Sequence, residues 1–432
     1  MVFNNSILLG AAGQGGAATF DPTLISNSVW LDGSADGLTA PSSTFSAQDG
    51  KEFTLGTWFQ LTEFGVSGAL FCAGANPYTS LRHDGNNKIY FQTEAGTHIL
   101  NTTALFRDVG WYHILVSVDT TQSVSSNRVK IYINGVETTL TGTYPAVNHA
   151  YDFNTAVVHE VGDSYENGAF EGYLAQSFMI GSKSIQQGDF AITDFLDTFT
   201  FGTNGSQFIP KAHTDIKTLV NAGSSNSFLL QYENSSALGT DSSTNTNTFT
   251  ATSMGSANQS SNTPSLSYPL LNPLSAAFST PLTEGNTRAS GSSGNGDDIN
   301  PGIIIPKTGK WVWQITNNTD ADLIYGVRNF SDMKVSYDYT NLYGFYSHTG
   351  DLVQGGAPSG SYLDPASGGD VYQIYYNAET RKMWVSDNGT IPNSGDPDGG
   401  TNEAFTIPDS GFDLCPTALV GGTSPDTTFD FG

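Results

Sequence analysis

The chain has 432 residues, which is long for a single hydrophobic core and suits two domains of about 150–200 residues each. Charged residues make up only 13% of the chain, roughly half the usual share, whereas Gly (48 residues) and aromatic residues (12%) are abundant. Acidic residues outnumber basic ones by 41 to 16, and the net charge of −25 makes nucleic acid and anionic membranes poor partners. We interpret this charge mainly as a solubility feature, although an acidic surface can also recruit divalent cations. Solubility that rests on Ser, Thr, Asn and Gly is typical of an all-β protein rich in turns.

The first residues predict an arm. Residues 1–19 hold a short apolar stretch followed by a Gly/Ala/Gln run, without the basic start or the apolar length of a signal peptide. No other segment approaches the roughly 20 apolar residues of a membrane span, so we expect no membrane insertion. We expect 1–26 to be a flexible tail, or an arm that packs only after assembly.

Strand patterns then run through residues 27–233, and most of them alternate apolar with polar side chains. The clearest unit is 128–137, which alternates strictly and turns at Asn134-Gly135, a pair that tolerates the positive φ of a type I′ hairpin. Helix is expected only as a short piece near 214–220. The strands expected here are 53–61, 88–93, 112–118, 129–133, 173–180 and 228–232.

The middle of the chain changes composition. Residues 234–262 are rich in Ser, Thr, Asn and Gly, and a second loose stretch follows at 290–300. Such segments bury little apolar area, so we expect linkers or long loops and place the domain boundary between them. The connector is taken as 234–300, with a possible first strand of the next domain.

The strand pattern returns in residues 301–432, with a second turn at Asn388-Gly389 directly after an alternating strand. The chain therefore predicts two antiparallel β-sandwich (jelly-roll) domains in tandem. Cys72 and Cys415 lie in apolar stretches and are expected to be buried free thiols. The strands expected here are 311–316, 323–327, 341–347, 371–376, 382–386 and a last one near 427–432.

Catalytic motifs were sought without success. A glycosidase needs two carboxylates facing one groove, but no Glu-x-Asp-x-(x)-Glu pattern occurs, and we interpret the cluster His159, Glu160, Asp163, Glu166 and Glu171 as a loop at a strand end. The seven histidines lack metal-ligand spacing, and there is no Gly-x-Ser-x-Gly, Walker or Cys-x-x-Cys motif. We predict no catalytic residue, no metal site and no cofactor. Calcium or a ligand at 163–167 is a weak alternative.

Sugar binding is the softer possibility. Sandwich lectins hold glycans with loop Asp and Asn side chains and an aromatic face. The alternative for the richest such stretch, near 337–348, is a strand edge with ordinary core aromatics. The candidate ligand-binding residues are Tyr337, Asp338, Tyr339, Asn341, Tyr343 and His348.

Four motifs in the first half resemble the concanavalin A-like (laminin-G/pentraxin) jelly roll. WYHILVSVD at 111–119 followed by VKIYING at 129–135 is similar to that family's "W-x-H-V" strand and "K-x-Y-x-N-G" hairpin. FTLGTW at 53–58 and FEGYLA at 170–175 are similar to two further family strands. The resemblance implies a jelly roll over 27–233, with His113 as a packing residue.

The C-terminal part resembles a SPRY-type sandwich. GKWVWQI at 309–315 is similar to the family's opening strand, with Val312 and Gln314 in place of its usual Tyr and Glu. DVYQI at 370–374 and RKMWVSDNG at 381–389 are similar to its strand pair ending in Asn-Gly. The last residues, from PTA through FDFG, are similar to its closing strand.

The combination of parts resembles long hypothetical proteins of marine phages, including the start at 3–12 and the connector at 271–286. It implies a virion structural protein of a tailed phage, an appendage or tail fibre at the virion surface that is assembled in the host cytoplasm and contacts host glycans. The alternatives are a capsid decoration or head-fibre protein without receptor binding and, with less support, a polysaccharide-degrading enzyme. Other virion proteins would be partners, and exposed sheet edges favour a homo-oligomer, first of all a trimer.

Overall fold

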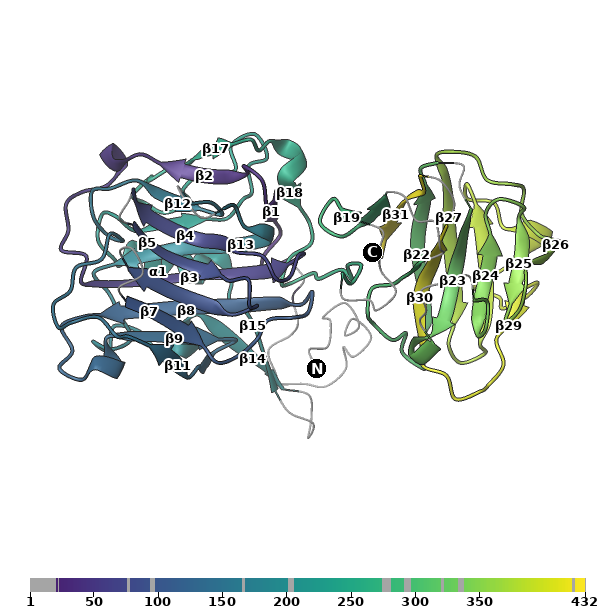
Figure 1. Cartoon of the computed structure of the whole chain (residues 1–432), viewed down its shortest axis with the longest axis horizontal. Helices are drawn as coiled ribbons and strands as arrows, with labels where there is room; N and C mark the ends of the chain where they lie inside the picture. The colour runs from purple at the N-terminus through teal and green to yellow at the C-terminus, as the bar shows by residue number, and fades with distance from the viewer. Residues whose placement is uncertain are drawn as a thin grey trace. The chain divides into compact units, whose positions relative to one another are not determined.

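The computed structural model describes residues 21–431 with gaps at 22, 76–77, 94–97, 165–167, 201–205, 274–280, 291–296, 320–321, 333–337 and 422–423. The chain divides into two compact units, Met1–Ser267 (unit 1) and Tyr268–Gly432 (unit 2). Both units consist mainly of antiparallel strands (Figure 1). The prediction of an all-β fold with tandem sandwiches is confirmed.

Unit 1 contains two eight-stranded sheets. The first has the order β10 (Val136–Glu137), β9 (Val129–Ile133), β8 (Trp111–Asp119), β3 (Glu52–Leu61), β13 (Glu171–Gly181), β1 (Ser28–Asp32) and β18 (Gln259–Ser260), with β16 (Phe228–Leu230) also paired to β13. The second has the order β11 (Leu140–Gly142), β7 (His98–Thr102), β6 (Ile89–Thr93), β5 (Tyr78–His83), β4 (Gly68–Gly74), β12 (His159–Val161), β2 (Gly37–Ala40) and β17 (Thr250–Thr252).

The main core of unit 1 follows from strand alternation. Successive side chains of a strand point to opposite faces of its sheet. Phe53, Leu55 and Phe59 of β3 are therefore buried together in the main core, whereas Trp58 is buried outside that cluster, against His113 of β8. The hydrophobic interior thus gathers every second residue of the central strands.

A smaller apolar layer covers the outer face of the first sheet. Phe178 and Ile180 of β13 contact Phe195, which precedes the hairpin of β14 (Leu196–Thr200) and β15 (Ser206–Pro210), and Ile216 of α1 (His213–Asn221). The short helix expected near 214–220 is confirmed. None of the described helices has the length and apolar character needed to cross a membrane.

Unit 2 pairs a seven-stranded with a six-stranded sheet. The first has the order β19 (Leu282–Thr283), β20 (Arg288–Ser290), β31 (Asp426–Asp430), β22 (Lys310–Asn317), β27 (Asp370–Asn377), β28 (Lys382–Asp387) and β29 (Phe405–Thr406). The second has the order β21 (Asp297–Ile299), β30 (Leu414–Val420), β23 (Leu323–Asn329), β24 (Leu342–Tyr346), β25 (Asp351–Gln354) and β26 (Ser359–Ser361). Trp313, Tyr325, Phe345 and Tyr372 lie in the core of this unit.

Both Asn-Gly turns form as predicted. Asn134 and Gly135 have φ values of 48° and 77° and join β9 to β10, and Asn388 and Gly389 have φ values of 46° and 80° after β28. Two consecutive positive φ values are the requirement of a type I′ turn, and Asn and Gly adopt them at little strain.

The segment 234–262 differs from the expected linker, because the structure makes it part of unit 1. It supplies β17, which pairs with β2, and β18, which pairs with β1. The buried Asp241 carboxylate accepts hydrogen bonds from the backbone N–H groups of Leu229 (2.9 Å), Ser243 (2.8 Å) and Asn247 (2.7 Å). Polar residues thus order this segment through side chain-to-backbone hydrogen bonds, which a burial argument from composition does not detect.

Cys72 in β4 and Cys415 in β30 are both buried and free. Each occupies the place of a small apolar residue in a strand, and burial, the largest cause, raises the pKa of the Cys415 thiol well above its usual range. The prediction of two buried free thiols is confirmed.

Two histidines of unit 1 are buried in their neutral form. His113 is 1% exposed and packs against Trp58 with 5.1 Å between ring centroids, as the family resemblance implies for a packing residue. Neither of its ring nitrogens has a hydrogen-bond partner among the described residues. Burial lowers the pKa of His113 to about 3 and, as the largest cause, that of His159 in β12 to about 4.

Replacing Asp241 with Ala is expected to destabilise unit 1 by about 3 kcal/mol or more, because several buried N–H donors lose a charged acceptor. Urea unfolding followed by tryptophan fluorescence measures this change. Glu233→Ala is the matched control, since Glu233 is exposed eight residues earlier in the same segment. Equal midpoints for Asp241→Ala and the wild type would return the segment to a linker.

Candidate functional site

Asp338, the charged member of the sequence-predicted site, helps to hold its own loop. Its main-chain carbonyl accepts a hydrogen bond from Arg328 of β23, and its carboxylate accepts one from the Thr340 N–H at 2.8 Å. The Arg328 side chain is fully buried, where it is paired with the buried Asp298 of β21. Asp338 therefore has a structural use that its sequence did not announce.

The other candidates of that segment lie in different surroundings. Tyr343 is 8% exposed within the core of unit 2, as the core-aromatic alternative expects, and Tyr339 packs partly buried against a small apolar cluster. Asn341 donates to Asp332 Oδ2 at 2.6 Å, and the exposed His348 lies 3.5 Å from Asp322. Tyr337 lies outside the described residues. These side chains are not gathered around one hollow among the residues that the structure describes.

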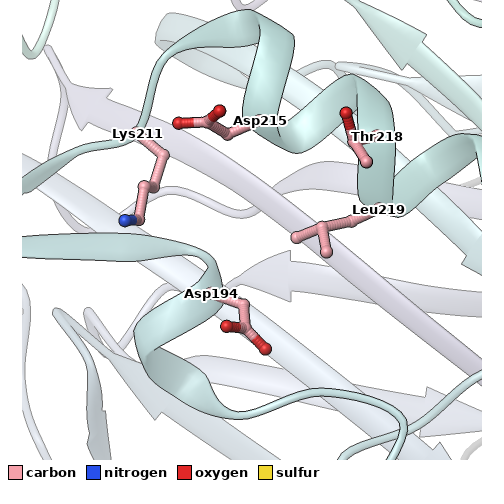
Figure 2. Close-up of a pocket in the computed structure, with 5 residues that line it drawn as sticks. All are labelled: Asp194, Lys211, Asp215, Thr218 and Leu219. Atoms are coloured by element: carbon pink, nitrogen blue, oxygen red, sulfur yellow. The ribbon is translucent and has the colours of Figure 1, made fainter.

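A hollow of about 260 Å³ lies beside α1 in unit 1 (Figure 2). Its charged groups already serve the local structure, because Lys211 is paired with Asp197, and the Asp194 carboxylate accepts a hydrogen bond from the Ala191 N–H at 2.8 Å. Asp215 lies in the first turn of α1, where a carboxylate favours the helix N-terminus. Two helix-end carboxylates and an engaged lysine do not suit this hollow to a neutral ligand. Its lining residues are Asp194, Lys211, Asp215, Thr218 and Leu219.

A second hollow of unit 1, of about 250 Å³, has a different chemistry. It is lined by Gln122 and Asn127 from the loop between β8 and β9, Lys130 of β9, and Ile185 and Gln186 from the loop after β13. We call these five residues the amide pocket. Three side-chain amides from two loops thus meet over the outer side of the first sheet.

The buried carboxylate of Asp119, at the end of β8, holds one side of the amide pocket. It accepts hydrogen bonds from the Thr121 N–H and hydroxyl, from Gln122 Nε2 at 2.5 Å and from Gln187 Nε2 at 2.8 Å. A carboxylate can accept about four such bonds, so its capacity is filled. Asp119 therefore fixes the Gln122 amide and joins the two loops that line the hollow.

Ser117 of β8 fixes the other side. Gln186 Oε1 accepts from the Ser117 hydroxyl at 2.5 Å, and Gln186 Nε2 donates to the Ser117 carbonyl at 2.8 Å. The same hydroxyl accepts the Ile185 N–H at 2.9 Å. This two-point attachment leaves one N–H and one oxygen lone pair of Gln186 for a ligand.

The remaining polar groups leave the amide pocket near neutral. Lys130 Nζ forms an ion pair with Glu137 Oε2 at 3.2 Å. The Asn127 side chain makes no hydrogen bond to any described residue, so both of its polar atoms are available. Amides that donate and accept, beside the apolar Ile185, match the hydroxyl and C–H surfaces of an uncharged sugar. The sequence gave no sign of this site, because its loops are about 60 residues apart along the chain.

The carboxylates were re-examined for glycosidase chemistry. Glu171 of β13 forms a side-chain hydrogen bond with Glu63, and it is the strand partner of Asp32 in β1. Hydrogen-bonded oxygens lie about 2.5–3 Å apart, whereas catalytic carboxyl pairs are separated by roughly 5 Å or more to admit a sugar. Glu63 and Glu171 are therefore a pair that sequence reasoning missed, with a spacing that does not suit hydrolysis.

The stretch 163–167, considered for calcium, is only partly visible because 165–167 lie outside the described residues. Among the described residues, no three His, Cys, Asp or Glu side chains are grouped so that they could hold a metal ion.

Burial, followed by the hydrogen bond to Glu63 and the charges of Glu63 and Asp32, raises the pKa of Glu171 to about 8. Folded unit 1 therefore retains a proton that the unfolded chain releases near pH 4.5, so its stability should fall as pH rises from about 4.5 through 8. Glu171→Gln keeps a neutral side chain at every pH and should melt above the wild type at pH 9. Thermal melts at pH 5, 7 and 9 measure this, with exposed Glu233→Gln as the control. An unchanged pH profile in Glu171→Gln would contradict the assignment.

Comparison with known proteins supports the fold of unit 1. Residues 32–180, about a third of the chain, match the family model of the concanavalin A-like lectin/glucanases superfamily. This match confirms the jelly-roll resemblance for that part of the sequence. No curated protein matches the chain.

Three solved structures illustrate its likenesses. The SPRY domain of human HERC1 is 16% identical, with 36% of this chain and 93% of that chain covered and a TM-score of 0.30. A heptameric SAP-like pentraxin from Limulus polyphemus is 11% identical (36% and 76% covered, TM-score 0.29), and a human SPRY domain is 11% identical (35% and 94% covered, TM-score 0.27). At these identities and TM-scores, none of the three carries an argument about what this protein binds.

Proposed function

We propose that the protein is a structural component of a tailed phage, exposed on the virion surface as an appendage or tail fibre, and that it binds neutral host glycans through the amide pocket. The observation that carries glycan binding is the pair of loops whose amides are held in place by Asp119 and Ser117. Polar groups fixed before binding lose less conformational entropy when a ligand arrives.

The net charge of the chain supports a neutral ligand. A protein of charge −25 repels phosphorylated and acidic polysaccharides, and the Lys130–Glu137 ion pair leaves no uncompensated cation in the pocket to attract them. Sugar hydroxyls donate and accept hydrogen bonds, as the amides of Gln122, Asn127 and Gln186 do.

Assembly on a particle is proposed from the sheets and from the sequence resemblance. Edge strands such as β10 and β26 end their sheets, and symmetric association into a homo-oligomer such as a trimer would cover such edges. The arm at 1–26 is proposed to take part in that assembly.

Asn127→Ala is expected to weaken retention on a neutral polysaccharide about three- to tenfold, because one hydrogen bond to a hydroxyl contributes about 0.5–1.5 kcal/mol. Biolayer interferometry on immobilised dextran, mannan and galactan measures it, with dextran sulfate as the charged comparison. The matched control is Asn101→Ala, a half-buried amide of β7 in the other sheet of unit 1.

Three outcomes of that experiment would count against the proposal. They are retention on none of the neutral polysaccharides, equal losses in Asn127→Ala and Asn101→Ala, and stronger retention on dextran sulfate than on dextran. Release of reducing sugar from a retained polysaccharide would instead favour the enzyme alternative.

Gold-labelled antibody against the protein is expected on the tail or its fibres in electron micrographs of intact virions. Labelling spread over the capsid, together with no polysaccharide retention, would favour a decoration protein. Particles without label would remove the protein from the virion surface.

A further inference from the structure

The seven-stranded sheet of unit 2 has one face turned away from the core. In β22, Trp313 and Ile315 are buried in the core, whereas Val312 and Gln314 alternate with them and face outward. Val312 is 54% exposed, the highest value among the large hydrophobic residues described in unit 2. An apolar side chain this open in mid-strand leaves apolar surface available for contact.

Cross-strand pairing builds two rows on this outer face. Val312 lies opposite Tyr375 of β27, and Gln314 lies opposite Gln373. The Tyr375 hydroxyl donates to Gln373 Oε1 at 2.7 Å, and Gln373 Nε2 lies 3.5 Å from Gln314 Oε1. An aromatic ring and two amides are thus linked in a series across β22 and β27, which lie side by side (Figure 1). We call Val312, Gln314, Gln373 and Tyr375 the amide–tyrosine face.

The loop 391–403 rises along one side of this face. It covers Trp384 of β28, which is fully buried and donates from Nε1 to the Thr401 carbonyl at 2.9 Å. The space between them is small, because a Cβ on Gly395 would lie 3.0 Å from the Trp384 ring. The loop therefore forms a fixed border beside Tyr375, the strand partner of Trp384.

The lysines near the face are engaged in holding that loop. Lys310 Nζ donates to the Asp398 carbonyl at 2.9 Å, and Lys382 Nζ donates to the Gly400 carbonyl at 2.9 Å and pairs with Glu403 at 3.1 Å. The four residues of the amide–tyrosine face carry no charge. Nothing in the face itself would select a charged ligand.

The geometry points to the amide–tyrosine face as a second binding surface for a neutral polysaccharide. The ligand class rests on the proposed function, whereas the surface is independent of the amide pocket. Tyr375 and Val312 offer apolar area to the C–H side of a sugar ring, and Gln373 and Gln314 offer donors and acceptors to its hydroxyls.

A second surface would change how the protein holds a long polymer. Two weak sites on one chain convert the second binding event into an intramolecular one, and retention then exceeds that of either site alone. The loss of one site should accordingly reduce retention on an immobilised polymer strongly while leaving the other site able to bind short oligosaccharides.

The test uses the full chain on immobilised dextran, mannan and galactan, with variants of each surface. Val312→Glu places a charge on the face without removing a core contact, and Tyr375→Phe removes only the hydroxyl that holds Gln373. The matched control is Val147→Glu, since Val147 of unit 1 is 50% exposed. We expect about tenfold or greater loss of retention for Val312→Glu, a smaller loss for Tyr375→Phe and none for Val147→Glu.

Calorimetry with short oligosaccharides of the retained polymer separates the two surfaces. Two sites per wild-type chain, and one after Val312→Glu or after Asn127→Ala combined with Gln122→Ala, would support both. If Val312→Glu and Tyr375→Phe bind like the wild type while the pocket variant loses binding, the face is overturned and the proposed function stands. If only the face variants lose binding, the pocket fails and the face stands. Equal losses in Val312→Glu and Val147→Glu, or no binding by the wild type, overturn the inference.

Discussion

Hydrogen bonds from short acidic and amide side chains to loop backbone are the interaction on which the rest of this structure depends. Strand alternation buries the two cores, but it does not order the long connections between strands. Asp119, Asp241 and Asp396 each accept two or more hydrogen bonds from the loop that contains or borders them. A buried carboxylate whose lone pairs are filled in this way is stabilised by the backbone that it orders. A chain with few charges and many Ser, Thr and Asn residues can in this way support loops that keep one shape.

The sequence predicted those features whose signals lie close together along the chain. The hairpin at Asn134-Gly135 was predictable because alternation and a positive-φ turn occur within ten residues, and Cys72 and Cys415 because their neighbours are apolar. Composition alone misled for 234–262. There the order comes from Asp241, a single residue within a polar run.

Sites assembled from distant segments were not predictable. The amide pocket joins residues near 122 with residues near 186, and the Glu63–Glu171 pair joins the loop after β3 to the start of β13. The segment 337–348 attracted attention through its residue types. Its alternation sends Tyr343 into the core, and its Asp338 is used by Arg328. Residue type locates polar and aromatic material, but sheet register decides which of it shares a surface.

The two proposed surfaces have electrostatics in common. Both are uncharged in a chain of net charge −25, and the lysines beside them are paired with Glu137, with Glu403 or with loop carbonyls. An acidic surround with neutral contact areas disfavours charged competitors through repulsion while leaving uncharged ligands unaffected. The composition would then contribute to selectivity as well as to solubility.

The two buried histidines of unit 1 have a consequence for the conditions under which this fold survives. In the unfolded chain a histidine takes up a proton near pH 6.5, but in the folded unit His113 and His159 take one up only near pH 3 and 4. The unfolded state therefore binds more protons throughout that interval, so unit 1 loses stability progressively as the medium acidifies below about pH 6.5. The tight contact of His113 with Trp58 thus makes neutral water a condition of long persistence, and an acidic compartment would act on this unit from within its own packing.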